Sequence, residues 1–176
     1  MRLQRHLAAI ASAMVFLAGA ASPTLAAGTV LMADGGAYYT QYGPATYWHF
    51  DWGKGYCGNI APCAGPPPTY VHWTYVNQGA GDMNYAYWRN PAPVAYPEFA
   101  SAFIPSRNAT ATVTYTIVYN GVSRQSAVLS QLPYYNQWVR LNAGGLYKVQ
   151  GVWLGDQSWY GSASDKVAFD EIKIEN

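Results

Sequence analysis

Short runs in which hydrophobic and polar residues alternate recur along this chain after residue 28. The clearest is residues 110–119, TATVTYTIVY, where every second side chain is apolar or aromatic and most of the others are threonine. A period of two is typical of a β-strand that buries one face. The run leads into Asn120 and Gly121, a pair that tolerates the positive φ angles of a type I′ turn, and VSRQSAVLSQ follows as a partner strand. We therefore predict a β-hairpin over residues 110–131.

Seven further segments are predicted strands because they are short, rich in aromatic and β-branched residues, and bounded by turn residues. They are residues 29–33, 69–76, 84–89, 98–104, 138–141, 146–154 and 166–174. The 17 glycines and 11 prolines interrupt the chain every few residues, and outside the N-terminal segment no run has a helical period. This pattern predicts an all-β fold, an antiparallel two-sheet β-sandwich, formed by residues 28–176 as a single domain.

The segment TYWHFDW, residues 46–52, concentrates four aromatic rings, an imidazole and a carboxylate. Read with a period of two, it places Trp48, Phe50 and Trp52 on one face of a strand. We expect that face to join the core, because an antiparallel strand commonly has one buried and one wet side. The opposite, polar row is a candidate for ligand contact and comprises Tyr47, His49 and Asp51.

Aromatic residues within the predicted strands are expected in the core, whereas those in turn-rich segments are candidates for ligand contact. The expected core set is Trp73, Tyr75, Trp88, Phe103, Trp138 and Phe169. The candidates in turn-rich segments are Tyr38, Tyr39, Tyr42, Tyr134, Tyr135, Trp159 and Tyr160. An alternative for this second set is that the rings cap the open ends of the sandwich.

Residues 1–27 have the order of a secretory signal peptide, with a basic start, MRLQRH, an apolar stretch and a small-residue end, SPTLAAG. We expect cleavage after Ala26 or Ala27. The apolar stretch falls short of the roughly 20 residues that span a bilayer, so a membrane anchor is the less favoured interpretation. The expected location is therefore secreted, extracellular or at the cell surface, with no membrane insertion.

The charge balance argues against one class of partner. The chain has 10 basic and 9 acidic side chains, and without Arg2 and Arg5 the basic number falls to 8. A near-neutral surface with no basic cluster argues against nucleic acid, whose phosphates require concentrated positive charge. The chain is only 11% charged but contains 16 tyrosines and 7 tryptophans. Their flat rings with polar tips suit sheets, interfaces and sugar-facing surfaces alike.

Two cysteines, Cys57 and Cys63, lie close together in CGNIAPC. In an exported protein they are expected to form a disulfide. A zinc site would require four ligands, and no histidine lies beside them. The bridge would fix a loop at the end of the polar row, and Tyr56 beside it is a further candidate for ligand contact.

Catalytic chemistry has little support in the residues. After the signal segment the chain has two histidines, His49 and His72, and it lacks the G-x-S-x-G, H-E-x-x-H and P-loop patterns. A small hydrolase using His49 and Asp51 is kept as an alternative. Asp170 is predicted to point at the core, where a carboxylate needs backbone donors, tyrosine hydroxyls or a cation. Calcium at Asp170 is therefore the one metal considered, and no other cofactor is predicted.

Seven stretches extend over most of residues 28–175: GPATYWHFDWGKGY, VHWTYVN, AYWRNP, FASAFIPSRNATATVTYTIVYNG, LSQLPYYNQWVRLNAGG, VQGVWLGDQ and KVAFDEIKI. Together they resemble the golvesin C-terminal-like domain, which is similar to the carbohydrate-binding domain of xanthan lyase. The most specific elements are FIPS, Gln131 ahead of NQWVRL, and AFDEI. The resemblance implies a jelly-roll-like sandwich that accompanies exported bacterial lyases, amidases and peptidases as an accessory binding module. The chain departs from it by the insertion CGNIAPCAGPPP.

These observations predict a non-catalytic binding module for a polysaccharide or cell-wall glycan. Sugar recognition needs an exposed flat ring under the apolar face of a sugar and polar side chains at its edge. The alternative is a structural or adhesive surface protein that acts through protein contacts or self-association of exposed tyrosines.

Overall fold

The computed structural model describes residues 28–52, 55 and 70–176. The predicted signal peptide, Tyr56 and the predicted disulfide between Cys57 and Cys63 lie outside the described residues. Two five-stranded sheets and one three-stranded sheet form the described part, and all strands within them pair antiparallel. The described residues form no helix with the length and hydrophobicity of a membrane span. The prediction of an all-β antiparallel sandwich is confirmed.

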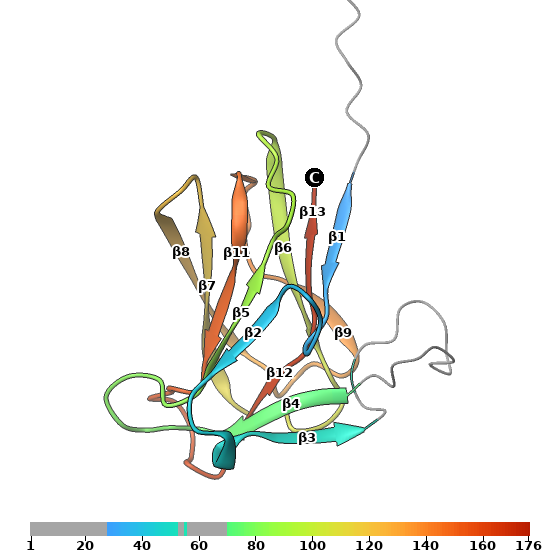
Figure 1. Cartoon of the computed structure of the whole chain (residues 1–176). Helices are drawn as coiled ribbons and strands as arrows, with labels where there is room; N and C mark the ends of the chain where they lie inside the picture. The colour runs from blue at the N-terminus through green and yellow to red at the C-terminus, as the bar shows by residue number, and fades with distance from the viewer. Residues whose placement is uncertain (1–27, 53–54, 56–69) are drawn as a thin grey trace, which may run out of the picture.

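Sheet 1 joins the two ends of the described chain. Its strands are β1 (Thr29–Met32), β13 (Ile172–Glu175), β6 (Pro97–Ile104) and β10 (Leu146–Tyr147) in that order, and β9 (Gln137–Arg140) also pairs with β6. The register places Ile174 between Val30 and Ala100. Figure 1 shows β1 and β13 side by side, so the last strand of the chain holds the first in place.

Sheet 2 contains the predicted hairpin. Its order is β2 (Tyr39–Tyr42), β5 (Tyr85–Arg89), β11 (Val149–Gly155), β7 (Thr112–Tyr119) and β8 (Ser123–Ser130). Asn120 and Gly121 have the expected positive φ angles of 48° and 88°. Pairing resumes with Ser123 opposite Tyr119, so the turn is one residue longer than the predicted two-residue type. Strand β2 was expected to be a turn-rich segment.

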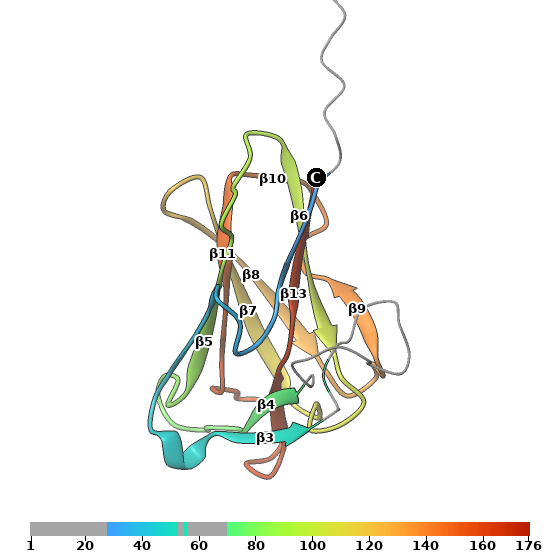
Figure 2. The same ribbon diagram turned by 45° about the vertical axis from the view of Figure 1, so that its right-hand side comes forward.

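Sheet 3 lies across one end of the sandwich. Its order is β12 (Lys166–Phe169), β4 (Tyr70–Tyr75) and β3 (His49–Trp52), and a short 3₁₀ helix, η1 (Ala45–Tyr47), precedes β3. Figures 1 and 2 show β3 and β4 crossing the long strands of the other sheets at the bottom of the molecule. The predicted strand over residues 166–174 is therefore two strands in different sheets, because Asp170 and Glu171 interrupt the apolar alternation where the chain turns from β12 into β13.

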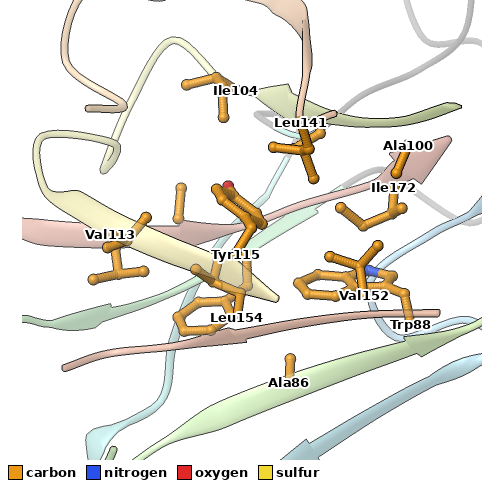
Figure 3. Packing of buried hydrophobic residues seen from close by; sticks show 14 of the residues in the cluster. Ala86, Trp88, Ala100, Ile104, Val113, Tyr115, Leu141, Val152, Leu154 and Ile172 are labelled. Carbon is orange, nitrogen blue, oxygen red and sulfur yellow. The ribbon is translucent and has the colours of Figure 1, made fainter. Parts of the chain in front are cut away.

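The core lies between sheets 1 and 2 and continues onto sheet 3. Figure 3 shows Trp88 and Val152 of sheet 2 beside Ile172 of sheet 1. Trp88 is 1% exposed and Phe169 is fully buried, which confirms both as core residues. The Phe169 ring, on β12, is stacked on the Trp88 ring at 6.5 Å between centroids. The same apolar core therefore holds sheet 3 against the sandwich.

Several aromatic residues expected on the core face point elsewhere. Tyr75 is 48% exposed on sheet 3, and Phe50 is 55% exposed on the edge strand β3. Phe103 is buried, but its neighbours along β6 face the core, so its ring lies on the outer face of sheet 1 under Trp138 at 5.5 Å. The alternation showed which residues share a face, but not which face is inside when both faces are apolar.

A group of buried titratable side chains lies where β1, β4 and the β12–β13 junction meet. The Asp34 carboxylate accepts a hydrogen bond from the His72 backbone N–H at 3.1 Å and lies 2.8 Å from His72 Nδ1. Burial raises the pKa of Asp34. Burial and, to a smaller extent, the neighbouring Asp34 carboxylate raise the pKa of Glu171 to about 8. Between about pH 4.5 and pH 8 the folded protein therefore keeps a proton on Glu171 that the unfolded chain releases.

We expect the Glu171 contribution to make the protein less stable as the pH rises. The unfolded carboxyl releases its proton near pH 4.5 and the folded one near pH 8, so the stabilising contribution is complete below the first value and lost as the pH rises through the second. Glu171→Gln is expected to remove about 2 kcal/mol of this pH-dependent loss, after a reduction for partial solvent contact. Urea unfolding at acidic and mildly alkaline pH measures the change.

Glu175→Gln, on sheet 1, removes one acidic side chain in the same way and is the matched control for this experiment. Other carboxyls with raised pKa values stay in both variants, so the slope of stability against pH is reduced and not abolished; in the described part of the chain they include Asp34, Asp82, Glu98 and Asp156. A Glu171→Gln protein with the wild-type slope would contradict the assignment.

Candidate functional site

Aromatic side chains gather on the outer face of sheet 2, which is turned away from the core. Val152 and Leu154 of β11 point inward and are buried, so Trp153 between them points outward. The register places Trp153 opposite Tyr87 of β5, and it places Tyr85 opposite Tyr42 of β2. We call these outward residues the aromatic cluster; its members are Tyr42, Tyr85, Tyr87 and Trp153.

The rings of the aromatic cluster stack in two pairs. Tyr87 and Trp153 lie 4.4 Å apart with 22° between their planes, and Tyr42 and Tyr85 lie 4.7 Å apart with 15°. Tyr85 is tilted by 46° against Trp153 at 5.6 Å. The Tyr87 hydroxyl donates a hydrogen bond to the Gln150 carbonyl at 3.0 Å. Tyr87 is therefore fixed by this hydrogen bond and by its contact with the indole, and its ring covers one face of Trp153.

Two glycines flank Trp153 on the outward face of β11. A Cβ at Gly151 would overlap the Tyr87 ring, and a Cβ at Gly155 would overlap the Asp82 carboxylate. Because neither position carries a side chain, the ring and the carboxylate lie directly on the strand. The sequence GVWLG thus places one indole between a tyrosine ring and a carboxylate.

A groove runs beside the aromatic cluster over the outward side of β7. Two adjoining hollows of about 420 and 340 Å³ form it, and Asp82, Thr114 and Thr116 line both. Thr116 lies opposite Trp153 in the sheet. Since threonine side chains are short, the indole face that Tyr87 does not cover forms part of the groove wall. The other side chains lining the groove include Tyr85, Arg124, Gln157, Trp159 and Tyr160.

The loop after β11 places two exposed rings at one end of the groove. Trp159 and Tyr160 are 68% and 56% exposed. The Ser158 hydroxyl donates to the Thr112 carbonyl at 2.5 Å and accepts from the Tyr160 N–H at 3.1 Å. These bonds anchor the loop to β7, so the rings are presented from a fixed position.

Asp82 and Arg124 are the two charged side chains among the described residues that line the groove. Burial raises the pKa of Asp82, and the hydrogen bond from the Gln157 backbone N–H to Asp82 Oδ1, at 2.8 Å, opposes this rise. The groove therefore combines one carboxylate acceptor, one guanidinium donor and a row of threonine hydroxyls beside a flat ring. Such a surface suits a ligand with an apolar face and many hydroxyl groups.

The structure brings three of the sequence-predicted candidates to this face. Trp159 and Tyr160 line the groove, and Tyr42 belongs to the aromatic cluster. Tyr39 is half-buried and packs on the core, with its ring 5.3 Å from that of Trp88. Tyr38 instead lies under the Arg89 guanidinium at 5.8 Å.

The other tyrosine candidates do not line the groove. Tyr134 is half-buried against the core, whereas Tyr135 is 68% exposed. Tyr47 lies in η1 instead of a strand and lines a separate hollow of about 340 Å³ together with Tyr75 and Met83. The candidates therefore do not form one site.

The predicted polar row His49 and Asp51 lies on the outer face of sheet 3, around Trp73. The His49 ring is stacked on Trp73 at 4.2 Å, and the Lys166 ammonium lies 4.4 Å from the indole centroid. Lys166 donates to Asn108 Oδ1 at 3.0 Å, and Asn108 in turn donates to Asp51 at 2.6 Å. Trp73 was predicted in the core, but it faces outward. Because β3 and β12 supply neighbours on both sides, this indole offers less free face than Trp153.

His49 and Asp51, the two residues of the hydrolase alternative, do not form a catalytic dyad in this structure. In the described part of the chain no hydrogen bond joins His49 to Asp51, and His72 is bonded to Asp34. Asp170 is 3% exposed, as predicted. No three His, Cys, Asp or Glu side chains among the described residues are grouped to hold a metal ion. Calcium at Asp170 stays a prediction.

Comparison with known proteins places the chain in no family. The sequence matches no protein-family profile and no curated protein. A solved structure to which the fold is similar contains the CBM22-1 and GH10 modules of endo-1,4-β-D-xylanase 10B from Clostridium thermocellum, complexed with xylohexaose, at 14% identity and a TM-score of 0.39. The alignment covers 82% of this chain and 28% of that one, so this chain spans less than a third of the xylanase chain. At this similarity the match assigns no function, and the golvesin resemblance stays a prediction.

Sequence reasoning missed three members of the aromatic cluster and most of the groove lining. Tyr85, Tyr87 and Trp153 lie in predicted strands but alternate with buried neighbours such as Ala86 and Leu154. This alternation with buried neighbours is the sequence signal that could have placed the three residues on the outer face of the sheet. Asp82 carried no comparable signal, because its position over Gly155 arises from a loop contact between distant segments.

Proposed function

We propose that the protein is a non-catalytic binding module for a polysaccharide or cell-wall glycan, and that the groove on sheet 2 is its binding site. The observation that carries the proposal is the Trp153 indole, held on one face by Tyr87 and bordering a groove with a polar floor on the other. A sugar ring has an apolar face that stacks on an indole and an edge of hydroxyls that bond to polar side chains. The floor threonines and Asp82 lie where those hydroxyls would be.

The proposed affinity is modest. A groove that contacts a few sugar units through one main ring gives binding in the millimolar to micromolar range, about −4 to −8 kcal/mol. Repeated units along a polymer raise the apparent affinity by rebinding. The predicted export of the chain and its resemblance to golvesin C-terminal-like domains accord with a role on extracellular glycans beside an exported bacterial enzyme.

Retention of the purified protein on insoluble polysaccharides tests the proposal. The panel is cellulose, xylan, curdlan, chitin and peptidoglycan, with bovine serum albumin as the non-binding control. We expect specific retention on at least one polymer and release by soluble fragments of it. If the protein stays in the supernatant with every polymer, the glycan proposal fails. Concentration-dependent oligomers in light scattering would then favour the adhesive alternative.

A further inference from the structure

The floor of the groove is a regular row of threonine side chains along β7. Thr112, Thr114 and Thr116 alternate with residues that are buried in the core, so all three point outward. Successive outward residues of a strand lie about 7 Å apart. The row therefore gives the groove a scale of length, along which its other side chains can be placed.

Trp153 lies between two charged side chains along this scale. Trp153 is opposite Thr116, and Arg124 is opposite the residue two positions further along β7. Asp82 is seated on Gly155, two positions from Trp153 in the other direction. A guanidinium that donates hydrogen bonds and a carboxylate that accepts them thus lie about 7 Å to either side of the indole, measured along the strands.

The loop after β11 places a second pair of rings beyond the carboxylate. The Ser158 hydroxyl donates to the Thr112 carbonyl at 2.5 Å, so the loop is tied to that level of β7. Trp159 and Tyr160 follow directly and line the same hollow; we call these two rings the loop platform. Thr112 lies four residues along β7 from the level of Trp153, which corresponds to about 13–14 Å.

This separation is too large for one sugar unit. A pyranose ring is no longer than about two residues of a strand, about 7 Å, so a single unit on Trp153 does not reach the loop platform. About three to four consecutive units of one chain cover the distance. The units between the two platforms then lie over Asp82 and Thr114, whose oxygens accept hydrogen bonds from sugar hydroxyls.

The side of the groove formed by β8 is low. The outward residues of β8 that lie opposite the threonine row have short side chains, and they are Ser126, Val128 and Ser130. Val128 is 59% exposed, so this side is open to solvent. The rings therefore stand along one side of the threonine row and short side chains along the other. This shape accommodates a chain that runs along β7, whereas a pocket closed on all sides would hold one unit.

We propose that the groove binds an extended glycan chain over about three or more consecutive sugar units, with Trp153 and the loop platform as two separate stacking sites. This inference rests on the proposed function of the groove and specifies its ligand. The ligand is a stretch of a single chain, in contrast to one isolated sugar unit or the flat surface of a crystalline polymer. Both platforms act together only on a ligand that reaches both, so the affinity depends on chain length.

Titration calorimetry with soluble oligosaccharides of increasing length tests this dependence. The probes are cello-, xylo-, laminari- and chito-oligosaccharides from disaccharides to hexasaccharides, together with glycan-strand fragments of peptidoglycan. For each series that the wild-type protein binds, we expect the affinity to rise by about tenfold to a hundredfold between the disaccharide and the pentasaccharide, because the longer ligand gains a second ring contact. Beyond the pentasaccharide the affinity should level off.

Three variants locate the effect. Replacing both Trp159 and Tyr160 with alanine should lower the affinity for the pentasaccharide by about tenfold and leave the affinity for the disaccharide unchanged. Trp153→Ala should weaken the binding of every length. Tyr135→Ala removes a ring that is as exposed as Trp159, at 68%, but does not line the groove, and it should keep the wild-type dependence on length. Thermal unfolding shows whether each variant is folded.

The outcomes distinguish the two proposals. If no polymer of the panel and no oligosaccharide is bound, the proposed function of the groove fails. If polymers are retained but no oligosaccharide binds, or if the affinity stops rising at the disaccharide, the function stands and the inference of an extended chain is overturned. The same holds if the folded double variant keeps the wild-type dependence on chain length.

Discussion

Replacing Trp153 with alanine is expected to reduce glycan binding by roughly tenfold to a hundredfold. The indole supplies the flat wall of the groove, and the loss of an apolar contact surface of this size costs about 1.5–3 kcal/mol of binding free energy. The fold should tolerate the change because Trp153 lies on the outer face of sheet 2, while its neighbours Val152 and Leu154 fill the core. Depletion assays on the polymer retained by the wild-type protein measure the effect.

Trp73→Ala is the matched control for this prediction. Trp73 also lies half-buried on an outer face, but on sheet 3, and it does not line the groove. We expect the Trp73→Ala protein to bind the glycan as well as the wild-type protein does. Any loss should be confined to thermal stability. If Trp73→Ala loses binding and Trp153→Ala keeps it, the glycan site is on sheet 3 and the groove assignment is wrong.

Replacing Gln131 with leucine is expected to destabilise the protein by about 3–5 kcal/mol, because three polar groups would each lose a buried partner. Gln131 is fully buried. Its Nε2 donates to the Tyr115 hydroxyl at 2.9 Å and to the Ala168 carbonyl at 3.0 Å, while its Oε1 accepts the Ala168 N–H at 3.0 Å. Leucine has a similar size, so the loss reports the hydrogen bonds and not a cavity.

Urea unfolding of Gln131→Leu measures this loss, and Gln137→Leu serves as the control. Gln137 is exposed on β9, so its replacement should change the free energy of unfolding by less than about 0.5 kcal/mol. A decrease below about 1 kcal/mol for Gln131→Leu would show that the amide does not join β12 to sheet 2 as the geometry indicates. The sequence resemblance had already singled out Gln131, and the structure supplies the physical reason for its position.

The local parts of the fold were predictable because they depend on neighbouring residues. The alternation over residues 110–119 and the pair Asn120 and Gly121 specify a strand and a turn with no information from the rest of the chain. The segment over residues 166–174 was not predictable in the same way. Asp170 and Glu171 interrupt its alternating pattern, but that interruption alone does not show that the chain passes there from sheet 3 to sheet 1. That change depends on which strands pair with each half.

The candidate site was only partly predictable. Trp159 and Tyr160 were found because a turn-rich segment cannot bury every ring. Trp153 was missed because an aromatic residue in a strand is usually assigned to the core, and Trp73 and Tyr75 were assigned there for the same reason. In all three cases the alternation showed which neighbours share a face with the residue. The packing of the other sheet decided which of the two faces is exposed to solvent.

The antiparallel strands, the place of the main hairpin and the sets of residues that share a face could all be predicted from the sequence, because they follow from backbone geometry over a few residues. Which faces are buried depended on tertiary packing. It also decided that Asp82, from one loop, lies on Gly155 of a strand more than seventy residues away. Such placements depend on the packing of distant segments, and the groove, its ring wall and its single carboxylate are all of this kind.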